Sequence, residues 1–225
     1  MPHTVLDEVP TAAPEYAGLL VDWGGVMTTD VFASFAAFAE AEGLAADAVA
    51  RLLRHDAGAR ALLDGLETGA ADPAEFERGL AALLGVAADG LIRRLMAGVR
   101  VDERMIAAVR AARQAGAATG LVSNSWGPSG YPRELIAEMF DGVVISGEVG
   151  VRKPRPEIYR LGADAIGVPP AQCVFVDDLR GNLRPAEELG MTVIHHTSAD
   201  ETASRLAALF AAKRPQPGHH QERAS

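Results

Sequence analysis

Side chains able to bind a cation or a phosphate group follow short apolar runs at three places in the chain. Asp22 ends the run AGLLVD, Ser123 and Asn124 end AATGLVSN, and the adjacent acids Asp177 and Asp178 end CVFVDD. Carboxylates brought close together repel one another unless a cation or a lysine joins them. Oxygen ligands suit a hard cation such as Mg²⁺, and hydroxyl and amide groups donate to phosphate oxygens. The residue types therefore indicate magnesium-assisted phosphoryl transfer, provided that the fold brings them together.

The apolar runs themselves predict strands of a parallel sheet. Each is short and rich in β-branched residues and none alternates polar with apolar, which is typical of strands buried on both faces. Segments of helical periodicity separate them, and Gly116, Gly167 and Gly190 stand where helix C-caps are expected. This alternation predicts a doubly wound α/β fold with a Rossmann-like core. The five expected strands lie within residues 17–22, 117–124, 141–146, 173–178 and 191–196.

Such a sheet gives the polar residues a common location. Ligands of open α/β sheets bind beyond the carboxyl ends of the strands. We therefore expect Asp22, Ser123 and Asp177 to meet at one edge of the sheet. Lys153 lies in VGVRKPRP, just before a predicted helix, and would bring a positive charge to the same edge.

The interval from Asp30 to Val101 interrupts the alternation, because it carries no convincing strand. Its helical patterns are VFASFAAFAEAEG, AADAVARLLRH, PAEFERGLAALLG and ADGLIRRLMAGV. Asp30, Asp47 and Asp72 stand at expected N-cap positions. A crossover between parallel strands needs only about a dozen residues, so the interval predicts an inserted helical subdomain. We expect a loose leader over 1–16, an α/β core over 17–29 and 102–212, a helical cap over 30–101, and a disordered tail over 213–225.

Composition excludes several classes of function. Among 225 residues, 30 acidic against 21 basic side chains give a formal net charge of −9, which argues against a nucleic-acid partner. The single cysteine, Cys173, excludes an intrachain disulfide and a zinc site made of cysteines alone. The chain contains no run near the ~20 apolar residues of a membrane span, and its start lacks a signal-peptide pattern. We expect a cytoplasmic protein without a membrane partner; composition does not indicate its oligomeric state.

Four segments resemble, in order, the four motifs of the haloacid dehalogenase superfamily of phosphatases. They are VDWGGVM, GLVSNSW, VGVRKPRPEIY and VFVDDLRGN. The helical insertion lies where that superfamily places its common type of cap. The resemblance extends over nearly all of residues 17–200 and is greatest to the N-terminal phosphatase-like domain of soluble epoxide hydrolases. That domain shares the step from asparagine through serine or threonine to tryptophan, and a run from paired aspartates to LGM.

The resemblance implies a role for each acidic residue. Asp22 would be the nucleophile that forms an aspartyl-phosphate intermediate, and would also bind Mg²⁺. The backbone carbonyl of Gly24 and the side chain of Asp178 would complete the metal ligands. Asp177 would hold Lys153 or a water of the metal in place.

The resemblance also implies how the phosphate group of a small phosphorylated metabolite is held. Ser123, the amide of Asn124 and Lys153 would bind the oxygens of the transferring phosphoryl group. Lys153 would in addition neutralise Asp22. Trp126 is expected either to line the mouth of the pocket or to fill the junction between cap and core.

One position departs from the family pattern. The phosphatases usually carry a second aspartate, the general acid/base, two residues after the nucleophile, and this chain has Gly24 there. General acid/base catalysis contributes about 10²–10⁴-fold, so we expect slow turnover of poor leaving groups. Water, the substrate or a cap residue would supply the proton, and His55 is a candidate, although it also fits an exposed helical position. Arg152, beside Lys153, could read a second anionic group, but we expect it to be solvated.

Three functions follow from these residues. The first is a Mg²⁺-dependent hydrolase of small phosphate monoesters. The second is a 2-haloacid dehalogenase that uses Asp22 on carbon without a metal, which leaves Asp177 and Asp178 without a purpose. The third is a non-catalytic module that binds a phosphate ligand or a protein partner, and Gly24 favours it.

Overall fold

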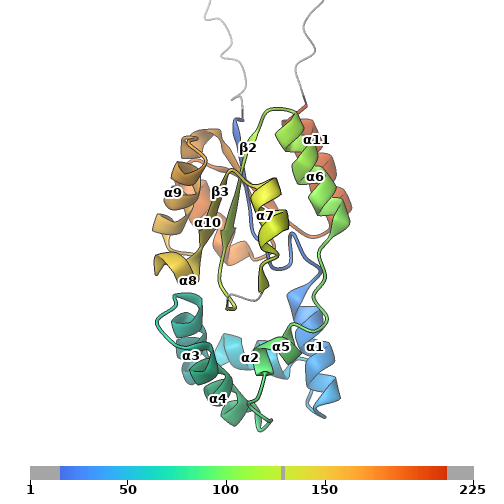
Figure 1. Cartoon of the computed structure of the whole chain (residues 1–225), viewed down its shortest axis with the longest axis vertical. Helices are drawn as coiled ribbons and strands as arrows, with labels where there is room; N and C mark the ends of the chain where they lie inside the picture. Colours follow the sequence, from blue (N-terminus) through green and yellow to red (C-terminus); the bar gives the residue numbers. More distant parts are fainter. Residues whose placement is uncertain (1–15, 128–129, 212–225) are drawn as a thin grey trace, which may run out of the picture.

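The computed structural model describes residues 16–127 and 130–211 (Figure 1). Within them a five-stranded sheet has the order β3-β2-β1-β4-β5, and each neighbouring pair is parallel. The predicted doubly wound α/β fold is therefore confirmed, and every expected run contains a strand. The strands are β1 (Gly18–Val21), β2 (Ala118–Ser123), β3 (Gly142–Ile145), β4 (Cys173–Asp177) and β5 (Thr192–His195).

Helices cover both faces of the sheet because side chains of a strand alternate between its faces. On one face Leu19 and Val21 of β1 pack with α6 (Glu103–Gln114), α7 (Arg133–Met139) and α11 (Ala199–Leu209). On the other face Leu20 packs with α9 (Pro156–Ala165) and α10 (Arg180–Glu188). Figure 1 shows these two layers on either side of the strands. The short helices Ser146–Val149 (α8) and Pro170–Gln172 complete the core.

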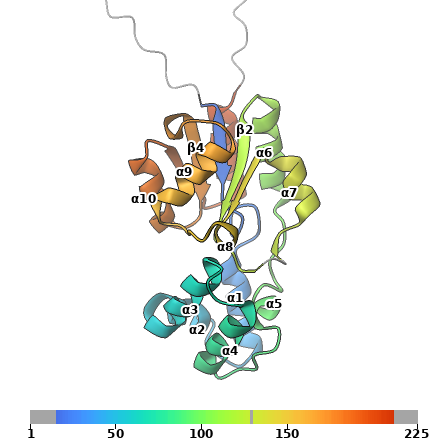
Figure 2. The ribbon, with the colours of Figure 1, turned by 60° about the vertical axis from the view of Figure 1, so that its left-hand side comes forward.

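The helical insertion, residues 30–101, forms a separate layer below the α/β core in Figures 1 and 2. It has an apolar cluster of its own that includes Phe35, Phe76 and Leu80. Its helices are α1 (Val31–Ala41), α2 (Ala48–His55), α3 (Ala57–Glu67), α4 (Pro73–Leu84) and α5 (Leu91–Leu95).

The two ends of the helical insertion lie side by side. Thr28 and Val101 form an isolated antiparallel bridge, and the Thr29 N–H donates to the Arg100 carbonyl at 2.8 Å. The Asp102 N–H donates to the Met27 carbonyl at 2.9 Å. The chain therefore leaves the core and returns to it through one narrow connection.

The predicted caps differ in their local chemistry. Asp30 and Asp72 accept the expected hydrogen bonds, from the N–H groups of Phe32 and Ala74. Asp47 stands at the N-cap of α2 but makes no capping hydrogen bond. Its backbone, at φ −88° and ψ 0°, is not extended as an N-cap usually is, and its carboxylate binds Arg51 instead.

Part of the expected organisation falls beyond the described residues. The leader over 1–16 and the tail over 213–225 lie outside them, except for Tyr16, whose ring packs edge-on against Phe210.

Helix α3 follows α2 directly and was not predicted; its N-cap, Asp56, accepts a hydrogen bond from the N–H of Ala59. None of the described helices has the length and apolar character that a membrane crossing requires.

Candidate active site

A buried lysine joins two carboxylates at the carboxyl ends of β1 and β4. Register places Val21 of β1 level with Val176 of β4, so that Asp22 and Asp177 come next to each other. The Nζ of Lys153 lies 2.7 Å from Oδ1 of Asp22 and 2.8 Å from Oδ2 of Asp177. All three residues are less than 9% exposed. The predicted convergence of these three residues therefore holds in the geometry.

Asp177 is held by more partners than the lysine alone. Its Oδ1 accepts from the Leu179 N–H at 2.8 Å and from Nδ2 of Asn182 at 2.9 Å. The residue has no exposed surface. A carboxylate with three donors has a fixed orientation, and through it Asp177 keeps Lys153 in position.

Asp178 lies beside this pair and is less buried. One carboxylate oxygen from each of Asp22, Asp177 and Asp178 falls within 4.8 Å of the others. Gly25, at φ +76°, makes room for Asp178, because a Cβ at Gly25 would stand 2.6 Å from its Oδ2. Three oxygen donors with one lysine leave an excess of negative charge. This donor set fits a hard divalent cation such as Mg²⁺.

Burial controls the protonation of these groups. It raises the pKa of Asp22 to about 8; the neighbouring carboxylates act in the same direction and Lys153 opposes them. Burial and then Asp177 raise the pKa of Asp178 to about 6. Burial also lowers the pKa of Lys153, but Asp177 and Asp22 outweigh it and raise that pKa overall. The buried carboxylates therefore disfavour one another's ionisation, and a bound cation would offset this repulsion.

The end of β2 supplies the predicted phosphate donors. Ser123 is buried, and its Oγ shares a hydrogen bond of 3.0 Å with the hydroxyl of Tyr131. The side chain of Asn124 accepts from the Lys153 N–H at 2.9 Å and donates to the Lys153 carbonyl at 3.2 Å. It therefore orients the lysine loop, and the predicted phosphate contact of Asn124 would fall to its backbone N–H.

Glu67, the last residue of α3, was not predicted as part of the site. Its Oε2 accepts from Nδ2 of Asn124 at 3.1 Å and from Nε of Arg152 at 2.8 Å. The Ser146 hydroxyl also donates to the Glu67 carbonyl. Burial raises the pKa of Glu67 to about 7, although Arg152 lowers it. These contacts tie the helical insertion to both the asparagine and the lysine loop.

The expectation that Arg152 is solvated was wrong. Its side chain is 22% exposed and forms ion pairs with Glu67 and, at 3.3 Å, with Asp64. The pairing depends on α3, which the sequence pattern did not reveal. The available signal was the spacing of Asp64 and Glu67, since residues three apart share one face of a helix.

A cavity of about 790 Å³, the main cavity, separates these residues from the helical insertion. Its polar side contains Asp22, Lys153 and Asp178, whereas its opposite wall is largely apolar. The apolar wall includes Val31, Phe32, Phe35, Leu53, Leu63, Ile92, Met96 and Val99. The arrangement suits a ligand with a charged end and an apolar body.

Trp126 meets both expectations at once. It lines the main cavity, and its ring packs 5.2 Å from Phe35 and 5.6 Å from Phe76. It therefore fills the junction between core and insertion and also lines the main cavity. His55, by contrast, is exposed and is not among the residues that line the main cavity.

Gly24 also lines the main cavity, at the position of the missing acid. Its φ lies outside the left-handed region, and an added Cβ would contact only Cγ2 of Val31, at 3.3 Å. A Cβ at Gly24 therefore fits if the Val31 side chain shifts by a few tenths of an ångström, whereas one at Gly25 would collide with Asp178.

Comparison with known proteins gives this geometry a context. A family model described as haloacid dehalogenase-like hydrolase matches residues 7–190. The chain is 32% identical over 126 residues to Bifunctional epoxide hydrolase 2 of Rattus norvegicus, covering 53% of this chain and 22% of that protein. It is 32% identical over 114 residues to Sesquiterpene phosphatase astK of Aspergillus oryzae, covering 49% of this chain and 58% of the relative. The chain thus matches less than two thirds of the length of either relative.

Solved structures share the fold at lower identity. A HAD family enzyme of Bacteroides thetaiotaomicron, crystallised with magnesium and inorganic phosphate, superposes with a TM-score of 0.58 at 20% identity. The match covers 80% of this chain and 93% of that one. A protein described as a dehalogenase superposes with a TM-score of 0.65 at 18% identity, over 90% of this chain and all of the other. At these identities the likeness concerns the fold.

Proposed function

Because the chain belongs to the haloacid dehalogenase-like hydrolases, we propose that it hydrolyses small phosphate monoesters with Mg²⁺ as cofactor and Asp22 as nucleophile. The observation that carries the proposal is the bridge of Lys153 between Asp22 and Asp177, with Asp178 beside it. Nucleophilic displacement at carbon needs neither of the last two acids. Their presence favours phosphoryl transfer over dehalogenation.

The residues divide the reaction between them. A carboxylate oxygen of Asp22 attacks phosphorus, the bond from phosphorus to the ester oxygen breaks, and the leaving oxygen takes a proton from water. Water then attacks the aspartyl-phosphate, which releases inorganic phosphate and restores Asp22. Ser123, the backbone N–H of Asn124 and Lys153 hold the phosphoryl oxygens throughout.

Asp22, Asp178 and the carbonyl of Gly24 would hold the cation. When bound, Mg²⁺ supplies positive charge that offsets the negative charge of the carboxylates and the phosphoryl oxygens. Asp177 keeps Lys153 in place through the 2.8 Å ion pair. Gly24 has no side chain to donate a proton, so the leaving group depends on water or on its own acidity.

The proposed class of substrate follows from the residues that line the main cavity. Its wall in the helical insertion is mainly apolar, with Phe32, Phe35 and Met96 among its residues, although Arg54, Arg93 and Arg100 also line it. One relative is named for its action on a sesquiterpene phosphate, an ester with an apolar body. We therefore assign to this chain a phosphorylated metabolite whose carbon skeleton is mainly apolar.

The helical insertion acts in this proposal as the cap, residues 30–101, over a core made of 17–29 and 102–212. Its two chain crossings lie together, as at a hinge, and Glu67 joins it to the core on the far side of the cavity. Closing the cap would exclude bulk water from Asp22, which strengthens every electrostatic contact there.

Hydrolysis of a chromogenic aryl phosphate, with and without Mg²⁺, tests the proposed function. We expect metal-dependent turnover, and kcat/KM falling steeply as the pKa of the leaving group rises, because Gly24 cannot protonate it. Halide release from a 2-haloacid without metal would identify a dehalogenase instead. Binding of phosphate esters without any turnover would identify a non-catalytic module.

A further inference from the structure

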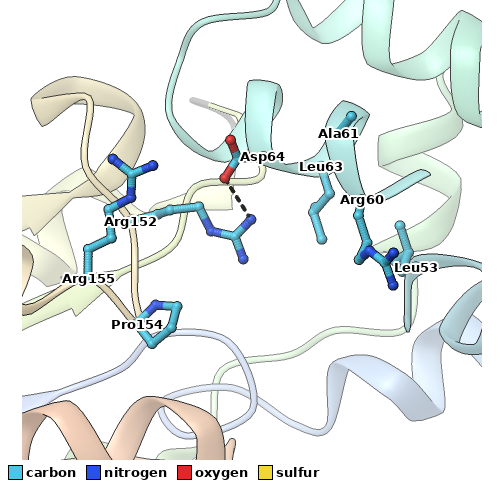
Figure 3. A pocket seen from close by; sticks show the side chains of 8 residues that line it. All are labelled: Leu53, Arg60, Ala61, Leu63, Asp64, Arg152, Pro154 and Arg155. Atoms are coloured by element: carbon cyan, nitrogen blue, oxygen red, sulfur yellow. Dashed lines mark hydrogen bonds and ion pairs between the residues drawn. The ribbon is translucent and has the colours of Figure 1, made fainter. Parts of the chain in front are cut away.

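A second cavity, of about 520 Å³, opens where the helical insertion meets the loop before α9. We call it the arginine cavity, because Arg60, Arg152 and Arg155 line it together with one acid, Asp64. Figure 3 shows Arg60 on α3 and the other two arginines on the facing loop. Its remaining lining residues are Leu53, Ala61, Leu63 and Pro154. Three arginines around one cavity contrast with a chain whose net charge is −9. Figure 3 shows the guanidinium groups of Arg60 and Arg155 on opposite sides of it.

Arg152 and Arg60 have defined contacts there. Arg152 is held by Glu67 at 2.8 Å and by Asp64 at 3.3 Å, and Figure 3 shows its side chain extending from the loop toward α3. Nη1 of Arg60 donates to the Arg54 carbonyl at 2.9 Å. These contacts hold two of the guanidinium groups in place before any ligand arrives.

The positive charge is only partly compensated. Within residues 16–127 and 130–211, neither Arg60 nor Arg155 forms an ion pair. Both residues are exposed, so a ligand that approaches from solvent can reach their charges. Guanidinium groups bind phosphate and carboxylate oxygens in pairs, with two parallel hydrogen bonds. The cavity therefore has the chemistry of an oxyanion site.

The arginine cavity adjoins the main cavity. Leu53, Leu63 and Arg152 line both of them. The main cavity in turn contains Asp22 and Lys153. A ligand long enough to reach past Leu53 and Leu63 would have one end at the nucleophile and the other near the arginines.

We propose that the arginine cavity binds a second oxyanion group of the substrate, a phosphate or a carboxylate joined to the reacting phosphate by an apolar linker. The inference rests on the proposed function for the reacting end and adds the distal specificity. It places Arg60 and Arg155 as specificity residues without a part in the chemistry. Leu53 and Leu63 would contact the linker.

Binding of non-hydrolysable ligands tests this independently of turnover. Calorimetry with Mg²⁺ present compares alkyl monophosphonates with α,ω-bisphosphonates of increasing chain length. Wild type is compared with Arg60→Gln/Arg155→Gln. The matched control is Arg78→Gln/Arg160→Gln, which removes the same charge from exposed arginines of α4 and α9 that line neither cavity.

The expected result is tighter binding of a bisphosphonate of suitable length than of the matching monophosphonate, at one ligand per chain. The Arg60/Arg155 variant should reduce that preference roughly three- to tenfold, the size of two exposed ion pairs, and the control should keep it. The inference is overturned by an equal preference in both double variants, or by no preference in the wild type. Two monophosphonates bound per chain would assign the cavity to a separate anion and also overturn it.

The outcome is separable from the fate of the proposed function. A bisphosphonate preference that depends on Arg60 and Arg155, in a protein that hydrolyses no phosphate ester, would remove the phosphatase and leave the second oxyanion site standing. Turnover of simple alkyl phosphates, unchanged in the arginine variants and without any bisphosphonate preference, would do the reverse.

Discussion

The two sides of the main cavity are built on different principles. At the strand ends, Asp22, Asp177 and Lys153 are buried charges, and each has partners at hydrogen-bond distance. The facing wall of the helical insertion is made mainly of apolar side chains such as Phe32, which is 37% exposed. Charges that must keep one geometry lie on the rigid sheet, whereas the surface that contacts the substrate body depends on non-directional packing. The comparison teaches that the residues for the reaction and the residues that select the substrate lie on separate parts of the fold and can vary independently.

Glu67 is the exception to that division. It belongs to the helical insertion, yet it is buried and bound to Asn124 and Arg152 of the core. The position of the helical insertion is thus linked to the charge state of the Glu67 carboxylate. The predictions below test each side of the comparison and then this link.

Replacing the nucleophile should give the largest effect. Asp22→Asn keeps the shape but removes the attacking charge, so we expect turnover of an aryl phosphate to fall at least about a thousandfold. The matched control is Asp30→Asn, because asparagine also caps a helix. Unchanged circular dichroism would show that the fold survives. A purified Asp22→Asn protein with near wild-type turnover contradicts the assignment.

The two adjacent acids should separate into a ligand and a positioning residue. Asp178→Asn is expected to weaken Mg²⁺ binding at least about tenfold without loss of stability, because burial already disfavours its charge. Asp177→Asn leaves the buried Lys153 with one carboxylate and should cost about 3–5 kcal/mol of unfolding free energy. Calorimetric titration with Mg²⁺ and thermal unfolding measure the two effects. Equal effects of both substitutions on both measurements would argue against the division.

Restoring an acid should change the leaving-group dependence. Gly24→Asp requires only a small shift of Val31, whose Cγ2 lies 3.3 Å from an added Cβ, and is expected to raise turnover of alkyl phosphates about tenfold. Aryl phosphates should gain little, because their leaving groups depart unprotonated. Gly24→Asn is the control for shape without acidity. An equal gain for both substrate classes would show that the substitution acts by something other than proton donation.

The strand-end residues were predictable because a parallel sheet converts sequence position into spatial position. A side chain that follows a buried run must lie at the carboxyl edge, so Asp22, Ser123 and Asp177 needed only the strand pattern. Lys153 needed more, since it belongs to a loop. Its place at the edge was expected from its position just before a predicted helix and its role from the family resemblance, and the ion pair of 2.8 Å with Asp177 agrees with both.

For the helical insertion, the sequence predicted that helices form but not how they pack. Helical periodicity gives the direction of an apolar face but not the partner against which it packs. Nothing in that pattern placed Glu67 against Asn124, or Arg60 opposite Arg155. The interval between α2 and α4 carried no signal strong enough to predict α3, because Asp56 serves as the end of one helix and the cap of the next.

The link through Glu67 should appear as a pH dependence of stability. Burial raises its pKa from an ordinary 4.5 to about 7, so between these values the folded state keeps a proton that the unfolded state has lost. The contribution of Glu67 to stability is therefore greatest below pH 4.5 and is lost as pH rises to about 7. Glu67→Gln imitates the protonated carboxyl at every pH. We expect wild type and variant to have similar unfolding free energies near pH 5, and the variant to be more stable by roughly 1–3 kcal/mol near pH 8.

Denaturant unfolding of both proteins at several pH values between 5 and 8 measures this difference directly. Other titrating groups, Asp22 and Asp178 among them, act in both proteins and cancel in the comparison. Asp64→Asn is the matched control, because it removes the second carboxylate on Arg152 from an exposed position of the same helix. Its effect should be small and equal at every pH. A constant difference between wild type and Glu67→Gln across the range would mean that the carboxylate is ionised throughout, held by Arg152 as an ordinary ion pair. In that case the position of the helical insertion does not depend on the protonation of Glu67. No titrating group would then link the insertion to the strand ends of the core.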